Sequence, residues 1–279
     1  QAGARIAAAL ESERGAAPEI LHVSDLRSYP TVPFLEEALG AADQMLGEAA
    51  HGAQRLEVIA QLAGVAPEVS RWPVHLCAGT PAVQIVTHAE KLNAALIVVG
   101  LRQHGRLDRI IGDETTLQVQ RHSTCAVFAA RGDSTGLPRR IVAGIDFTRA
   151  SVAAARAAVD IAMPDAKMTL VHAQEPDDGS ITDDGHAVVN SLGVARALEE
   201  VRNFLVSQLP TDSPVTIDTL AGSGRPFYLL RSTAERVNAD LIAIASRRHG
   251  PVARLMLGSA AAELARACDT SLLLVPPVS

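Results

Sequence analysis

Short aliphatic runs alternate with longer Ala-rich or amphipathic segments through the second half of the chain. Each run consists mostly of Val, Ile, Leu and Ala, which is typical of strands that are buried on both faces. These predicted strands are 141–147, 167–173, 215–222, 240–246 and 271–277. The segments between them have the length and pattern of helices, and prolines follow two of them, as expected where a helix ends. The predicted helices are 149–162, 188–209, 226–237 and 259–268.

Strands that alternate with helices of this length form right-handed βαβ units around a parallel sheet. The pattern therefore predicts an α/β fold with a doubly wound, Rossmann-like sheet of five parallel strands. The acidic, Gly-containing stretch at 175–187 is predicted to be a loop.

The chain also repeats itself. Residues 94–105 read AALIVVGLRQHG and residues 239–250 read ADLIAIASRRHG, each an aliphatic run followed by Arg-x-His-Gly. A repeat of this length is the size of a small domain rather than of a solenoid unit. We therefore expect two domains, 1–132 and 139–279, called here the first and the second copy. A short linker rich in Gly, Ser and Pro joins them and favours domains that pack against each other.

The first copy follows the same order with one omission. It opens on a predicted helix, residues 1–15, and continues into a strand at 19–25. Nothing corresponds to the strand at 141–147 or to Asp146 at its end. Either residues of the protein precede the sequence given, or the first sheet lacks a strand. We favour the former, because the loss of an internal strand would expose a long sheet edge.

Composition narrows the function classes. With 48% hydrophobic but only 3% aromatic residues, the core must be aliphatic. A net charge of −6 argues against nucleic-acid binding, which depends on clustered positive charge. No apolar run is long enough to span a membrane, and no signal-peptide pattern opens the chain. We expect a cytoplasmic protein with no nucleic-acid or membrane partner.

The three cysteines, Cys77, Cys125 and Cys268, are widely spaced and lie in apolar surroundings. An odd number without paired spacing indicates a reducing compartment and small core residues rather than disulfides. No Cys or His lies at zinc-ligand spacing from another, so the sequence predicts no metal site.

Residues 241–277 of the second copy, LIAIASRRHGPVARLMLGSAAAELARACDTSLLLVPP, resemble a universal stress protein domain. The shared layout is an aliphatic strand, a Gly/basic loop, a helix opened by Gly-Ser and a final aliphatic strand. Residues 96–131 have the same frame with altered loop residues, and IVAGIDF at 141–147 is similar to the family's first strand. The resemblance implies a tandem universal stress protein with adenine nucleotide alpha hydrolase-like domains. It also implies that 124–131 and 270–276 pair within the chain, in place of a dimer contact, and a further homodimer is compatible with it.

In nucleotide-binding members, the resemblance implies Gly, two residues, Gly, nine residues, then Gly followed by Ser or Thr. Glycines let the backbone approach phosphates, and a helix N-terminus offers unpaired N–H groups to an anion. The second copy has Ala245 and Arg248 at the loop positions and keeps Gly258-Ser259. Asp146 matches the family's acid near the adenosine part of the ligand.

Basic residues make the same loop cationic and suited to a phosphate. They include Arg247 and Arg248, while Gly250 partly restores the turn although it lies two positions late. The alternative is that these arginines are solvated or ion-paired and that Ser259 only caps the helix. The sequence leaves both open, with ATP as the candidate cofactor.

The first copy departs further from the pattern. It retains Gly100, but Gln103 takes the second position and Asp113-Glu114 replace the Gly-Ser pair. Two carboxylates at a helix start suit the helix dipole but repel a phosphate. We therefore expect no nucleotide in this copy.

His22 and His172 occupy equivalent places at the end of the second strand of each copy. They mark a ligand pocket or, as we favour, are held by local hydrogen bonds. The segment GSGR at 222–225 resembles part of a phosphate loop, but the full motif is absent and a turn is predicted.

Three functions stay open. The first is a stress-response binding and signalling module whose second copy holds ATP or another phosphate ligand. The second is a nucleotide-free structural or interaction protein of the same fold. The third, a slow nucleotide hydrolase, ranks last because the sequence offers no catalytic group, and we expect a binding protein rather than an enzyme.

Overall fold

The computed structural model describes residues 1–24, 40–100, 109–131, 134, 136–174, 191–246 and 259–277. All predicted strands and helices of the second copy are confirmed, with ends that shift by a few residues. The predicted loop at 175–187 and the Arg-x-His-Gly loops lie outside the described residues.

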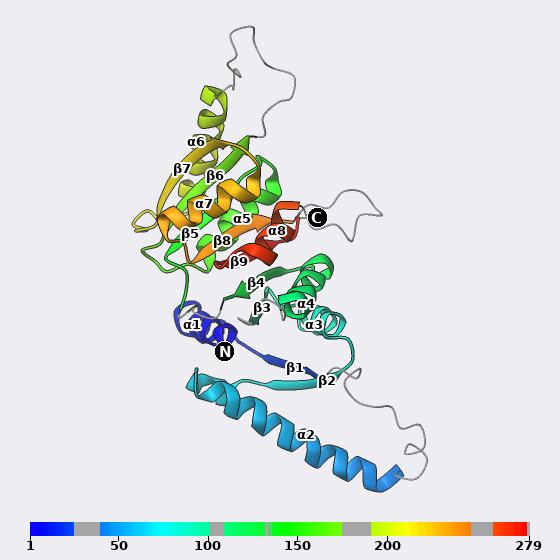
Figure 1. The fold of residues 1–279 in the computed structure, drawn as a ribbon. Coiled ribbons are helices and arrows are strands. Elements are labelled where there is room, and N and C mark those ends of the chain that lie inside the picture. Colours follow the sequence, from blue (N-terminus) through cyan, green and yellow to red (C-terminus); the bar gives the residue numbers. More distant parts are fainter. Residues whose placement is uncertain are drawn as a thin grey trace.

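The strands of the second copy form a parallel sheet in the order β7-β6-β5-β8-β9 (Figure 1). Strand β5 lies between β6 and β8, so the chain winds outward from it in both directions. The strands are β5 (Arg140–Gly144), β6 (Lys167–Gln174), β7 (Thr216–Ser223), β8 (Leu241–Ala245) and β9 (Ser271–Val275). The sequence prediction of a doubly wound parallel sheet is confirmed.

Alternate residues of β5 belong to different layers of the core, because successive side chains of a strand point to opposite faces. Ile141 packs with helices α5 and α6 on one face, while Val142 packs with α7 and α8 on the other. These helices are α5 (Arg149–Asp160), α6 (Ser191–Ser207), α7 (Pro226–Val237) and α8 (Ser259–Ala267). Both layers are almost entirely aliphatic, as the composition predicted.

The sheet of the first copy is divided into two pieces. Among the described strands, β1 (Ile20–Ser24) and β2 (Val74–Ala78) pair only with each other. Strands β3 (Leu96–Gly100) and β4 (Ala126–Ala130) instead join the sheet of the second copy. In chain order, β1 corresponds to β6 and β3 corresponds to β8. In the second copy, β5 lies between β6 and β8 and pairs with both. In the first copy, no strand of the described residues lies between β1 and β3 in this way. All five residues of β1 are accordingly only half-buried.

The helices of the first copy surround this divided sheet (Figure 1). They are α1 (Ala2–Arg14), α2 (Gly40–Ala63), the short 3-10 helix η2 (Pro67–Arg71), α3 (Pro81–Lys91) and α4 (Arg109–His122). Helix α1 bridges the two pieces. Its residues Ile6 and Leu10 lie in the same core cluster as Phe128, whereas Ala4 and Ala7 pack on the cluster around Val69 and Trp72.

The two copies meet through their last strands. Strand β4 pairs antiparallel with β9, with Phe128 opposite Leu273, and the sheet becomes seven-stranded in the order β3-β4-β9-β8-β5-β6-β7. Beside this pairing, the backbone N–H of Arg131 donates to Ser271 Oγ at 3.0 Å and its guanidinium donates to the Ala265 carbonyl at 3.1 Å. The expected pairing of 124–131 with 270–276 is confirmed.

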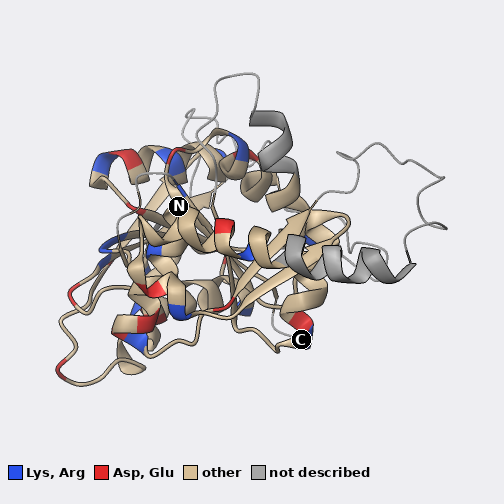
Figure 2. Cartoon of the chain, turned by 90° about the horizontal axis from the view of Figure 1, so that it is seen from below, with Lys and Arg blue, Asp and Glu red and all other residues tan. Residues whose placement is uncertain are grey.

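Charges of both signs are interspersed over the described ribbon (Figure 2). Several form ion pairs one helical turn apart, such as Arg156 with Asp160 and Arg231 with Glu235. None of the helices in the described part of the chain is both long and apolar enough to cross a lipid bilayer.

Phe128 allows a test of the junction between the copies. It is 1% exposed and lies in a cluster with residues of both copies. We expect Phe128→Ala to lower the free energy of unfolding by about 3–5 kcal/mol, because truncation leaves a cavity in a closely packed core. Urea unfolding followed by circular dichroism measures the change.

Phe204→Ala is the matched control, because Phe204 on α6 is 54% exposed. The same truncation there should change the free energy of unfolding by roughly 0.5 kcal/mol or less. If both variants lost the same free energy of unfolding, the packing of Phe128 between the copies would not be important for stability.

Candidate functional site

A cavity of ≈ 360 Å³ opens where the C-terminal ends of β5, β6 and β8 meet. Ligands of open α/β sheets bind in this crevice, since the connections from neighbouring strands leave there in opposite directions. Three of the predicted site residues, Asp146, Ala245 and Ser259, line this one cavity. The others, Arg247, Arg248, Gly250 and Gly258, lie outside the described residues.

Gly144, the last residue of β5, lines the cavity and lets β8 and α7 pack closely against β5. A Cβ atom at this position would lie 2.9 Å from Ile244 Cγ2 and 3.3 Å from Leu230 Cδ1. The first distance is shorter than van der Waals contact allows, so only glycine fits without movement of its neighbours. Sequence reasoning missed this residue, because the approach of β8 and α7 to β5 is not visible along the chain.

Asp146 is held by the turn between β5 and α5. Its Oδ1 atom accepts hydrogen bonds from the Thr148 backbone N–H at 3.1 Å and from Thr148 Oγ1 at 2.6 Å. Thr148 Oγ1 also accepts from the Ser151 backbone N–H at 3.2 Å, which caps α5. Phe147 has φ of 61° and lets the chain reverse between strand and helix. The carboxylate is therefore fixed in direction before any ligand arrives.

His172 lines the same cavity from the neighbouring strand, β6. Its Nδ1 atom lies 2.8 Å from the Ile145 carbonyl oxygen. A carbonyl oxygen only accepts, so Nδ1 carries the proton and Nε2 of the neutral ring is left as an acceptor. The ring packs on Phe147 with 4.5 Å between centroids. The predicted local hydrogen bond is thus present, and the side chain also belongs to the cavity.

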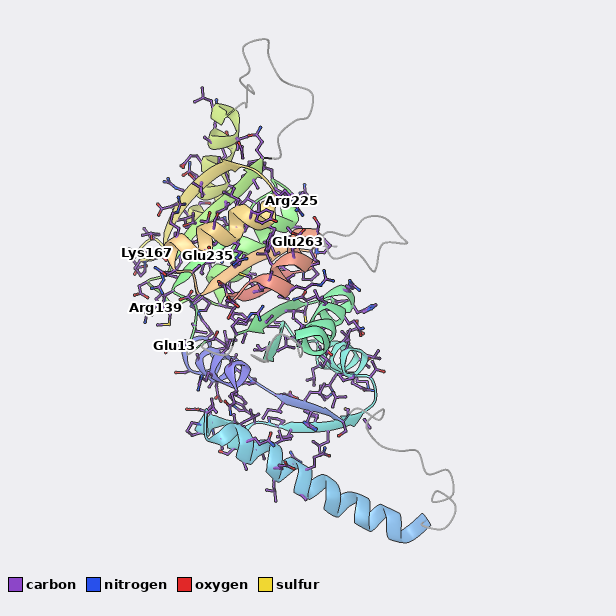
Figure 3. All side chains as sticks on the ribbon, viewed as in Figure 1. Glu13, Arg139, Lys167, Arg225, Glu235 and Glu263 are labelled. Atoms are coloured by element: carbon purple, nitrogen blue, oxygen red, sulfur yellow. The ribbon has the colours of Figure 1, made fainter. Side chains whose placement is uncertain are left out.

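Two helices begin beside the cavity, which Pro226 of α7 and Ser259 of α8 line. The N-terminal N–H groups of a helix carry a partial positive charge that favours anions. Arg225, just before α7, donates to Glu263 of α8 at 2.7 Å, and Figure 3 shows the two labelled side chains on these adjacent helices. This ion pair ties the helices together at the cavity. Of the GSGR segment, Gly222 and Ser223 end β7, and only Gly224 and Arg225 form the predicted turn into α7.

The corresponding region of the first copy is built differently. Helix α4 begins at Arg109, so Asp113 and Glu114 lie inside the helix, and their expected place at its start is wrong. The N-terminus of α1 also approaches the end of β3: a Cβ atom on Gly3 would be 3.5 Å from the backbone N of Gly100. No described residue of this copy takes the place of Asp146.

A sequence model of the Universal stress protein family matches residues 1–131 and again residues 138–276. The chain belongs to the universal stress protein family. It is a tandem member, because two family matches cover nearly its whole length. The resemblance inferred from the sequence is confirmed.

Solved structures agree with this assignment. A universal stress protein from Archaeoglobus fulgidus DSM 4304 superposes with a TM-score of 0.67 at 19% identity, over 98% of this chain and 93% of that chain. A functionally unknown protein from Pseudomonas aeruginosa PAO1 superposes with a TM-score of 0.57 at 16% identity, over 95% of each chain. These likenesses concern the fold. No curated protein sequence matches the chain.

Thr148 links the Asp146 carboxylate to the start of α5, so its loss should have two effects. We expect Thr148→Ala to lower the free energy of unfolding by about 0.5–2 kcal/mol, because the N-cap hydrogen bond is lost. It should also release the Asp146 carboxylate from its fixed direction. Thr148→Ser keeps the hydroxyl and should stay close to the parent protein. Chemical unfolding of both variants measures the difference, and equal stability of the two would refute the capping role.

Proposed function

We propose that the protein is a cytoplasmic stress-response binding and signalling module whose second copy binds ATP or another phosphate ligand. The observation that carries the proposal is the convergence of Asp146, Ala245 and Ser259 on one cavity at the ends of β5 and β8. These positions come from the nucleotide pattern of the family, and they are far apart along the chain. The proposal divides the chain into domains 1–132 and 139–279.

Separate features of the cavity suit the ribose and the phosphates of a nucleotide. Its volume of ≈ 360 Å³ suits a small ligand. In this proposal the Asp146 carboxylate, which lines the cavity, accepts hydrogen bonds from the hydroxyl groups of a ribose. Ser259 stands at the start of α8, where a phosphate would meet helix N–H groups. In this proposal Arg247 and Arg248 supply the positive charge, and Gly250 and Gly258 let the backbone approach the phosphates.

The first copy does not bind nucleotide in this proposal. No described residue of this copy takes the place of Asp146. Along the chain, Asp113-Glu114 replace the Gly258-Ser259 pair of the nucleotide pattern, so neither the glycine nor the hydroxyl of that pattern is retained. The first copy instead contributes β4 to the shared sheet.

The test is binding to the full chain. We expect adenine nucleotide to copurify and to be identified by mass spectrometry, and we expect ATP with Mg²⁺ to raise the thermal midpoint. A ligand that binds only the native state stabilises it by about 2.7 kcal/mol at a hundredfold excess over its Kd. No retained nucleotide and no shift at millimolar ATP would instead favour a nucleotide-free interaction protein.

Variants locate the site. We expect Asp146→Asn and Ser259→Ala each to weaken ATP binding about tenfold, since each removes a hydrogen-bonding interaction worth roughly 1.4 kcal/mol. Asp218→Asn is the matched control, because this aspartate is exposed on β7 and does not line the cavity.

A second pair of variants tests the assignment to one copy. Gly258→Asp should abolish binding, whereas Gly112→Asp in the first copy should leave the ATP-induced shift unchanged. Equal loss of ATP binding in both variants would overturn the assignment of the site to the second copy. Isothermal titration calorimetry measures the affinity of each variant.

A further inference from the structure

Three ligand-type side chains meet in the first copy, far from the cavity of the second. Glu19 immediately precedes β1, His75 lies on β2 and His88 lies on α3. His75 Nε2 is 2.6 Å from Glu19 Oε2, and the rings of the two histidines lie 4.4 Å apart between centroids. One donor atom from each residue lies within 4.8 Å of the others.

The fold explains why they meet. Leu21 of β1 is the parallel partner of His75 on β2, so the side chains of Glu19 and His75 emerge on the same face of this small sheet. Helix α3 follows β2 directly and packs against both strands. Its last turn brings His88 over that face.

The hydrogen bonding of this cluster is incomplete. The Nε2 atom of His88 is buried and has no hydrogen-bond partner among the residues that the structure describes. Buried polar atoms are nearly always partnered, so one without a partner requires an explanation. Burial, and then the neighbouring His75, lower the pKa of His88. The ion pair of Glu19 with His75 accounts for two of the three residues but leaves His88 Nε2 unexplained.

We infer that Glu19, His75 and His88 bind a divalent transition-metal ion, with Zn²⁺ as the representative. Two imidazoles and one carboxylate are a donor set that zinc and its neighbours prefer, and zinc with three protein ligands keeps one position for water. At zinc–ligand bonds of about 2.0–2.2 Å, tetrahedral ligand atoms lie about 3.4 Å apart. Binding requires the three donors, now within 4.8 Å of one another, to reach that separation by side-chain rotation.

The second copy shows that the fold itself does not require these residues. The Gly79 N–H donates to the Ser24 carbonyl as the Gly224 N–H donates to the Gln174 carbonyl, and this common register makes Thr169 and Leu220 the counterparts of Glu19 and His75. Helices α3 and α7 both begin at a proline, which places His88 opposite Thr233. Thr169 and Leu220 are half-buried, Thr233 is buried, and none of the three is a metal ligand of the zinc type. The cluster is therefore particular to the first copy.

The position of the cluster suggests what the ion does. Strands β1 and β2 form an isolated pair, and two-stranded sheets are only marginally stable by themselves. An ion held by β1, β2 and α3 joins all three elements. Because it binds the native state, it stabilises the first copy by mass action.

The experiment uses the full chain without a histidine tag, freed of metal by a chelator. We expect Zn²⁺ to bind with one equivalent in calorimetry and to raise the thermal midpoint. Co²⁺ should give the intense visible absorption of a four-coordinate site. No binding of Zn²⁺ by the correctly folded parent protein would overturn the inference.

Variants assign the ligands. His88→Gln preserves shape and should weaken Zn²⁺ binding at least tenfold while the far-ultraviolet circular dichroism stays unchanged, and His75→Ala should do the same. His122→Ala is the matched control, because this exposed histidine ends α4 outside the cluster. Cys77→Ser excludes thiolate ligation and should leave binding intact. Unchanged affinity in His88→Gln, or loss in Cys77→Ser alone, would contradict the assignment. ATP binding by the second copy is measured separately and is independent of either result.

Discussion

The hydrogen bonding of β5 to a strand on each side is the constraint on which the second copy depends. It joins β6 to β8 and thereby makes one continuous parallel sheet. The strand also supplies both layers of the core through Ile141 and Val142. Where it ends, the chain turns through Asp146 into α5 and the cavity opens between the diverging connections. The site exists because a central strand stops there.

In the first copy, the described residues place no strand in that central position, and the sheet is divided as a result. Strands β3 and β4 keep a continuous sheet only by pairing with β9 of the other copy. Strands β1 and β2 stand apart and are connected to the rest by helices. Trp72 Nε1 donates to Glu11 of α1 at 3.0 Å, one of the contacts that hold this part against α1. A metal ion at Glu19, His75 and His88 acts in the same region, and tethers a sheet that is short of hydrogen-bonded neighbours.

The two copies therefore share a frame and differ in the chemistry placed on it. In the second, glycine and hydroxyl residues line a cavity next to helix N-termini, where we propose a phosphate ligand. In the first, imidazoles and a carboxylate gather at the other end of the small sheet, which is an arrangement for a cation. Duplication permits this divergence, because residues of one copy can change while the other copy and the sheet that the two share are retained.

The elements, their order and the pairing of 124–131 with 270–276 were predictable from the sequence. Aliphatic periodicity and proline placement are local signals, and the repeat together with the family resemblance supplied the topology. Ala245 and Ser259 were proposed from the loop pattern of the family and Asp146 from the resemblance of its strand to the family's first strand, and all three line one cavity. Only the tertiary structure revealed that Gly144 lets β8 and α7 pack closely beside the cavity, that Arg225 pairs with Glu263, and that Glu19, His75 and His88 come together. Their partners lie on separate elements, and no spacing along the chain encodes a contact that depends on how strands and helices pack.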